Sequence, residues 1–196
     1  MNRRELLKRS ACVLGGVASG TLTHAVLAGV DGRAKIENPL LNAGQRSAVA
    51  AIAELIIPQT DTPGAIEAGV PHFIELMVSD WYTPTERKIF LSGLKALGQF
   101  CLASDKKDFV ACSTEQQIAA LQHAEQESKS YNGEQAQFMS NAVDENTPFF
   151  TKIKELTVLG YYTSEVGAKQ ELNYNPMPMK YDGDFDFAEV GRQWSS

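Results

Sequence analysis

Thr83-Pro84-Thr85-Glu86 is the clearest structural signal in the chain. Thr83 can cap a helix, Pro84 suits the first helical position, and Glu86 completes a capping box with Thr83. The residues that follow place three apolar side chains on one stripe of a helix that should end before Ser104. These side chains are Phe90, Leu94 and Leu97. The stretch therefore predicts a long amphipathic helix with one face in a helical core.

Two further helices are expected before this stretch. Asn42 can cap a helix that begins near Gln45 and runs to Ile57, where Pro58 stops it. Pro71 stands at the preferred first position of a second helix.

Three more helices are expected after it. Residues 113–117 open one, residues 134–143 can form another, and Thr147-Pro148 should cap a last helix from Phe149 to about Ser164. No alternating strand pattern of any length occurs. The predicted fold is all-α, a compact domain of about five to six helices.

The composition changes from Leu172 onward. Pro, Gly, Asn and Asp are too dense for regular structure, yet large apolar side chains are frequent, whereas disordered tails are poor in aromatic residues. This stretch should therefore lie against its own helices or against another protein. We divide the sequence into an export signal (1–28), a helical domain (29–171) and an extended C-terminal arm (172–196).

The N-terminus has the pattern of a twin-arginine export signal. The residues of the pattern are Arg3, Arg4, Leu6, Leu7 and Lys8. An uncharged run follows from Ser10 to Val30, diluted by Gly, Ser and Thr and thus less apolar than a membrane span. Cleavage is expected after Ala28. The alternatives are a cytoplasmic amphipathic helix and an uncleaved membrane anchor.

This signal predicts a periplasmic protein that crosses the membrane already folded. Residues 1–28 carry four basic side chains and one acidic one, so their removal changes the formal charge from −6 to −9. An acidic chain has no electrostatic reason to bind nucleic acid or anionic lipid. Contact with a membrane is expected only through a partner.

Two cysteines remain after such processing, Cys101 and Cys112, with a turn-forming stretch between them. In an oxidising compartment an internal disulfide is the first expectation. A bridge to a partner and two free thiols stay open as alternatives. No histidine pair lies nearby to complete a metal site.

No catalytic constellation stands out. Only His72 and His123 remain after processing, and the common metal, redox and dinucleotide motifs are missing from the sequence. A flavin or nicotinamide fold needs a βαβ unit, which a helical chain does not have. We therefore expect no enzyme, no catalytic, cofactor-binding or metal residues, and no cofactor in this chain.

Two blocks of the sequence carry a family resemblance. The first runs from Glu54-Leu55-Ile56-Ile57-Pro58 to Gly69-Val70-Pro71. The second runs from Phe149-Phe150 through Leu159-Gly160-Tyr161-Tyr162 to Arg192-Gln193-Trp194. Together they resemble the gluconate 2-dehydrogenase subunit 3 family, the small subunits of membrane-associated flavin dehydrogenases. Pro178-Met179 departs from the Pro-Gly that the family more often has.

The resemblance implies a non-catalytic partner of a larger FAD-dependent subunit of the glucose-methanol-choline type. That subunit oxidises a sugar, sugar acid or glycoside and often passes electrons to a c-type cytochrome. It lacks an export signal, so the small subunit escorts it across the membrane and supports its maturation. The alternative is an independent periplasmic enzyme or ligand-binding protein, with a pocket near His72 or Asp61.

The C-terminal arm and the last helix are the expected docking elements, because aromatic side chains are typical of interface hot spots. The candidate interface residues are Tyr161, Tyr162, Tyr174, Tyr181, Phe185, Phe187, Arg192 and Trp194. The alternative is that the tyrosine pair and part of the arm complete the core of this domain.

Overall fold

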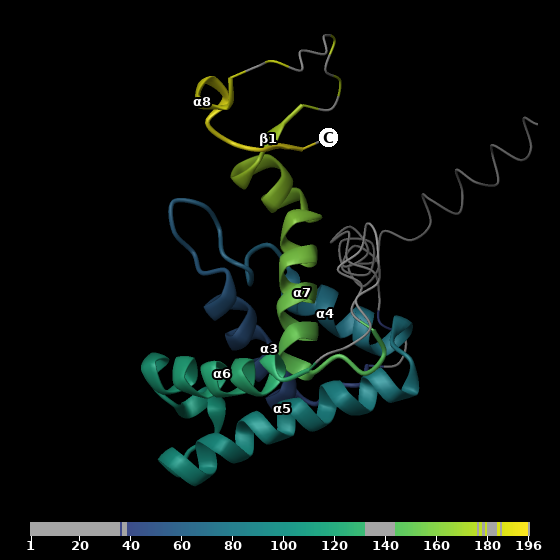
Figure 1. The fold of residues 1–196 in the computed structure, drawn as a ribbon, viewed down its shortest axis with the longest axis vertical. Helices are drawn as coiled ribbons and strands as arrows, with labels where there is room; N and C mark the ends of the chain where they lie inside the picture. Colours follow the sequence, from purple (N-terminus) through teal and green to yellow (C-terminus); the bar gives the residue numbers. More distant parts are fainter. Residues whose placement is uncertain are drawn as a thin grey trace, which may run out of the picture. The chain divides into compact units, whose positions relative to one another are not determined.

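The computed structural model divides the chain into two compact units, Met1–Lys35 and Ile36–Ser196. It describes residues 36, 39–131, 144–175, 177, 179, 184 and 186–195. The export signal and the predicted helix over 134–143 lie outside the described residues. The second unit is mostly helical, which confirms the all-α prediction (Figure 1).

Six α-helices form the described part of the second unit. They are α3 (Ala43–Ile56), α4 (Val70–Leu76), α5 (Pro84–Asp105), α6 (Thr114–Lys129), α7 (Phe149–Tyr162) and α8 (Phe187–Val190). Two π-helical segments, η1 (Met77–Trp81) and η3 (Gly167–Glu171), follow α4 and α7, and a 3₁₀ helix, η2 (Phe109–Ala111), precedes α6. The described strands are β1 (Asn173–Tyr174) and β2 (Trp194–Ser195).

Local capping chemistry sets three of the helix starts. In each case the capping side chain accepts a hydrogen bond from the backbone three residues on, and that residue's side chain bonds back to the cap. The pairs are Asn42 with Gln45, Thr83 with Glu86, and Ser113 with Gln116. These predicted helix starts are confirmed.

One predicted helix end was wrong. The α5 helix continues through Ser104, whose hydroxyl bonds back to the Phe100 carbonyl, and ends where Lys106 turns left-handed with φ 56°. The predicted start of the last helix at Thr147-Pro148 is confirmed, with Pro148 as the N-cap of α7. The Thr147 hydroxyl donates to Asp144 Oδ1 at 2.9 Å, because the Asp144 turn offers a charged acceptor.

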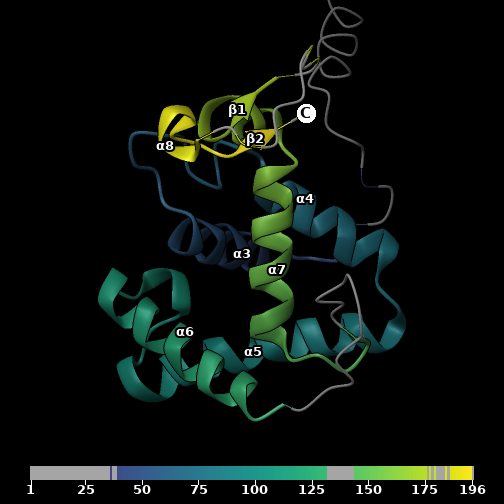
Figure 2. The same ribbon diagram turned by 45° about the horizontal axis from the view of Figure 1, so that its top comes forward.

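Helix α7 is the central element of the core, since it contacts α3, α4, α5 and α6 (Figure 2). Its buried face includes Ile153, Leu156 and Tyr161. At its start, the Phe149 ring packs edge-on against Phe90 of α5, with 5.3 Å between centroids. This packing explains why the stripe predicted on α5 is buried.

Two helix glycines give a matched test of this packing. A Cβ on Gly160 of α7 would lie 2.6 Å from Phe73 Cδ1, whereas a Cβ on Gly98 of α5 would meet nothing within 4 Å. We expect Gly160→Ala to lower the free energy of unfolding by about 1–3 kcal/mol through overpacking. Gly98→Ala should raise it by roughly 0.5–1 kcal/mol, because alanine loses less backbone entropy. Urea denaturation of both variants checks this, and a gain in both would contradict the close approach.

The C-terminal arm was expected to lack regular structure, but its two ends pair. Strands β1 and β2 run parallel, with Asn173 opposite Trp194 and Tyr174 opposite Ser195. The Ser195 hydroxyl donates to the Ala168 carbonyl of η3 at 2.7 Å. The two ends of the arm are therefore paired with each other and bonded to η3, whereas the sequence predicted an arm that is extended throughout.

Candidate interaction surface

The base of the arm determines which of its aromatic side chains faces outward. Ser195 and its register partner Tyr174 lie on the η3 side, where Ser195 bonds Ala168 and Lys169 Nζ lies 5.7 Å from the centroid of the Tyr174 ring. Successive side chains of a strand point to opposite faces, so Trp194 lies on the other face. It is 54% exposed. Trp194 is thus the arm's most accessible described aromatic side chain.

Arg192 holds the arm in place. Its Nη1 donates to the Gln170 carbonyl of η3 at 2.6 Å, and its own carbonyl accepts from Asn173 Nδ2 at 3.4 Å. The side chain therefore orients the base of the arm and with it Trp194. Of the other candidate residues, Tyr181, Phe185 and the side chain of Phe187 lie outside the described residues.

The two tyrosines that end α7 have different environments. Tyr161 is 2% exposed, and its hydroxyl donates to the Pro63 carbonyl at 2.8 Å. Burial raises the pKa of Tyr161 above its usual value. The expectation that Tyr161 lies at an interface was wrong, because it completes the core and fixes the loop before α4.

Tyr162, in contrast, is exposed and packs edge-on against Tyr161. With Val158 and Leu159 it forms an exposed apolar row on α7, here called the α7 stripe. Helix positions separated by three or four residues share a face, so these three side chains present one surface. The arm follows α7 through η3, so the α7 stripe and Trp194 of β2 are two exposed apolar regions in the C-terminal part of the chain.

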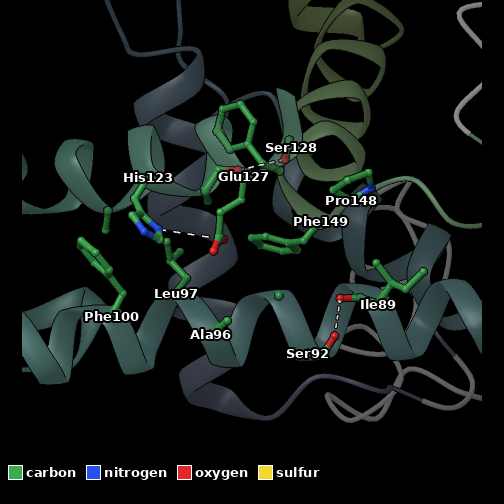
Figure 3. A pocket seen from close by; sticks show the side chains of 14 residues that line it. Ile89, Ser92, Ala96, Leu97, Phe100, His123, Glu127, Ser128, Pro148 and Phe149 are labelled. Carbon is green, nitrogen blue, oxygen red and sulfur yellow. Dashed lines mark hydrogen bonds and ion pairs between the residues drawn. The ribbon is translucent and has the colours of Figure 1, made fainter. Parts of the chain in front are cut away.

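A groove of about 410 Å³ runs between α5, α6 and the start of α7 (Figure 3). His123 stacks on Phe100 with 4.5 Å between ring centroids, and its Nδ1 lies 3.9 Å from Glu127 Oε2. Pro148 and Phe149 line the groove on the α7 side. Sequence reasoning gave His123 no role, although its i,i+4 spacing from Glu127 was visible.

The groove does not assemble a nucleophile with a base. The Ser92 hydroxyl donates to the Ile89 carbonyl and the Ser128 hydroxyl to the Ala124 carbonyl (Figure 3). Both hydroxyls are therefore committed to their own helices. The histidine and glutamate side chains are more than half exposed, which weakens the pair by solvent screening.

The loop around Asp61 is also structural. Asp61 Oδ1 accepts from the Thr60 hydroxyl at 3.1 Å, and the Thr62 hydroxyl donates to Glu171 Oε2 at 2.7 Å. Through Thr62 and Pro63 the loop is bonded to η3 and α7. These contacts place the first resemblance block against the second.

The structure contains two ion pairs that the sequence did not predict. Arg46 Nε donates to both carboxylate oxygens of Glu75 at 2.9 Å, and Glu75 is 7% exposed. Lys152 is completely buried and donates to Glu86 Oε1 at 2.9 Å. The partners are 29 and 66 residues apart, so no local pattern could reveal either pair.

In the part of the chain that the structure describes, no three or more His, Cys, Asp or Glu side chains are grouped as metal ligands would be. Among the same residues, no helix has the length and apolar character needed to span a membrane.

The family model for gluconate 2-dehydrogenase subunit 3 matches residues 43–179, from α3 through α7 into the arm. No curated protein and no solved structure matches the chain. The match covers well over half of the sequence and includes most of both blocks that carried the resemblance. The chain belongs to the gluconate 2-dehydrogenase subunit 3 family, whose name describes an accessory subunit of a dehydrogenase complex.

Proposed function

We propose that this protein is the non-catalytic small subunit of a periplasmic FAD-dependent dehydrogenase complex. The large subunit carries the FAD and oxidises a sugar, sugar acid or glycoside, and a c-type cytochrome accepts its electrons. The small subunit escorts the folded, signal-less large subunit through twin-arginine export and supports its maturation. Family membership over residues 43–179 is the observation that carries this proposal.

The N-terminal pattern supports the escort role. Twin-arginine export accommodates folded passengers, and the arginine pair stands at Arg3 and Arg4 of a small helical chain. A signal on the small subunit explains how a cofactor-loaded partner crosses the membrane with it.

We assign the docking face for the large subunit to the α7 stripe and Trp194. The α7 stripe is a continuous apolar row on a helix whose other face is core, and it remains exposed. A tryptophan held on an ordered base is a suitable anchor, since little side-chain entropy is lost on binding. Arg192 contributes by fixing that base.

The test is an affinity purification of the tagged mature protein from the periplasm, with an absorbance spectrum of the eluate. Flavin absorbance that accompanies a larger second chain supports the proposal. A colourless single species contradicts it and favours an independent helical protein.

Within the purified complex, we expect Trp194→Ala to weaken binding of the large subunit about 30-fold, as loss of a hot spot does. Trp81→Ala is the matched control, because Trp81 is 75% exposed but lies on η1, which adjoins α4 and α5. Titration of the small subunit against the isolated large subunit measures both. Equal affinities of the two variants for the large subunit would show that Trp194 is not part of the interface. Urea denaturation is the control for folding, and both variants should have the unfolding midpoint of the wild type.

A further inference from the structure

The two cysteines of the second unit lie at one corner of the fold. Cys101 is in the last turns of α5, the left-handed Lys106 reverses the chain, and Cys112 directly follows η2. Both thiols are free in the structure. Burial, the adjoining Cys112 thiol and the Asp105 charge raise the pKa of Cys101 to about 11. Helix α5 contacts η2, and both cysteines belong to the same buried core, so the fold brings the two segments that carry them together.

Burial decides which partner each sulfur can reach. Cys101 is 0% exposed and Cys112 is 8% exposed. A cysteine of another protein would have to enter the core to reach Cys101, whereas Cys112 belongs to the same buried core. Of the three possibilities that the sequence leaves open, the geometry favours the internal pair over a bridge to a partner.

We propose that Cys101 and Cys112 form an internal disulfide after the chain has folded, with Cys112 as the sulfur that reacts first. The oxidant is a disulfide, either of a thiol oxidoreductase or of a small thiol. The Cys112 thiolate attacks one sulfur of that disulfide and releases one thiol. The Cys101 thiolate then attacks the Cys112 sulfur and releases the second thiol. Two electrons and two protons pass from the protein thiols to the oxidant.

The order of reaction follows from how each cysteine is held. Cys112 caps a three-residue 3₁₀ helix through a 3.3 Å bond from its N–H to the Phe109 carbonyl, and its thiol lies 4.0 Å from the Lys107 carbonyl. A 3₁₀ helix has poorer hydrogen-bond geometry than an α-helix, so we expect η2 to open more readily than α5. Cys101 is inside a 22-residue helix and faces the core. Opening of η2 therefore exposes Cys112 while Cys101 stays buried.

The sequence makes the bridge simple to detect. Trypsin cuts after Lys95, Lys106, Lys107 and Lys129, so the two cysteines fall in separate peptides, 96–106 and 108–129. We would treat the purified, reduced full-length chain with oxidised glutathione, block the remaining thiols and analyse the digest without reduction. The expected product is the two peptides joined, two hydrogens lighter than their sum. Two blocked, unlinked peptides would overturn the proposal.

Single variants test the order. With Cys12 replaced by alanine in both variants, Cys101→Ala should accumulate a glutathione adduct on Cys112, because no second thiol remains to resolve it. Cys112→Ala should leave Cys101 largely unreacted. Faster adduct formation on Cys101 would overturn the assignment of Cys112 as the first sulfur. The wild-type digest needs no variant, so a misfolded variant leaves the pairing testable.

The bridge also has an energetic signature. Closing a loop of this length should lower the equilibrium constant for unfolding roughly 100-fold relative to the reduced protein. The double variant Cys101→Ala/Cys112→Ala should show no response to reductant, and a wild type equally indifferent to it would contradict a stabilising bridge.

The same digest, applied to protein taken from cells, separates this inference from the proposed export. A linked pair in both samples supports the disulfide and an oxidising compartment. A linked pair with glutathione but free thiols in cells supports the pairing and contradicts periplasmic export. A link from Cys112 to a peptide of another protein would overturn the internal pairing.

Discussion

Replacing Lys152 with methionine is expected to lower the free energy of unfolding by about 3 kcal/mol, the cost of breaking a buried ion pair from one side. Lys152 Nζ donates to Glu86 Oε1 at 2.9 Å and to the Asp144 carbonyl at 3.0 Å, and lies 5.1 Å from the centroid of the Tyr82 ring. Methionine fills a similar volume but leaves the carboxylate and the carbonyl without their donor. Urea denaturation at neutral pH measures the loss.

Lys154→Met is the matched control on the same helix. Lys154 is exposed, and its Nζ lies 5.9 Å from the centroid of the Phe150 ring. An exposed cation–π contact is worth about 0.5–1 kcal/mol, so this variant should remain close to the wild type. Similar losses in the two variants would show that the Lys152 pair does not stabilise α7 on α5.

The ion pair also sets a dependence on pH. Burial alone would raise the pKa of Glu86, but hydrogen bonds from the Thr83 backbone and from Lys152 outweigh it and lower the pKa below its ordinary value of 4.5. A lowered carboxyl pKa stabilises the folded state above that ordinary value, and the contribution is lost as pH falls through the lower folded value. In Lys152→Met, the stability should therefore decline less steeply below about pH 4.5.

The sequence predicted what local chemistry controls. Capping boxes act within four residues, so the starts at Asn42, Thr83 and Ser113 could be predicted without any tertiary information. The Lys152–Glu86 pair could not be predicted in this way. The role of Glu86 in the capping box already explains a glutamate at this position, so the sequence does not suggest a second partner for it. Its second role, as acceptor for a buried ammonium, exists only once α7 packs on α5.

The candidate interface could be predicted only in part, because burial of a side chain depends on tertiary packing. Aromatic content marks a segment that must be covered, but it does not say by what. Tyr161 and Tyr162 are adjacent, yet the rotation of about 100° between successive residues of a helix puts the first in the core and the second outside. The arm's pairing was missed since two-residue strands have no periodicity, and contacts of Arg192 and Ser195 with η3 hold them.

Replacing both Arg3 and Arg4 with lysine is expected to have the largest effect of any change, abolishing export of this chain and of its proposed FAD-dependent partner. The double variant keeps the net charge of the N-terminus, so an effect that depended on positive charge alone would survive it. The twin-arginine route reads the arginine pair itself, and under the proposed escort role the large subunit would depend on that pair in trans. Cell fractionation with detection of both chains measures the result.

The control is Arg9→Lys together with Arg33→Lys, which makes the same two exchanges outside the residues of the export pattern and should leave the export of both chains close to that of the wild type. In the Arg3→Lys/Arg4→Lys variant, export of the small and the large subunit is measured separately, because the two results together distinguish three possibilities. If this chain is still exported, the N-terminus is not a twin-arginine signal. If this chain is retained while the dehydrogenase still reaches the periplasm with its flavin, the large subunit has its own route, and the small subunit's role must lie in docking after export. Only retention of both chains fits an escort, because only then does one signal serve two folded proteins.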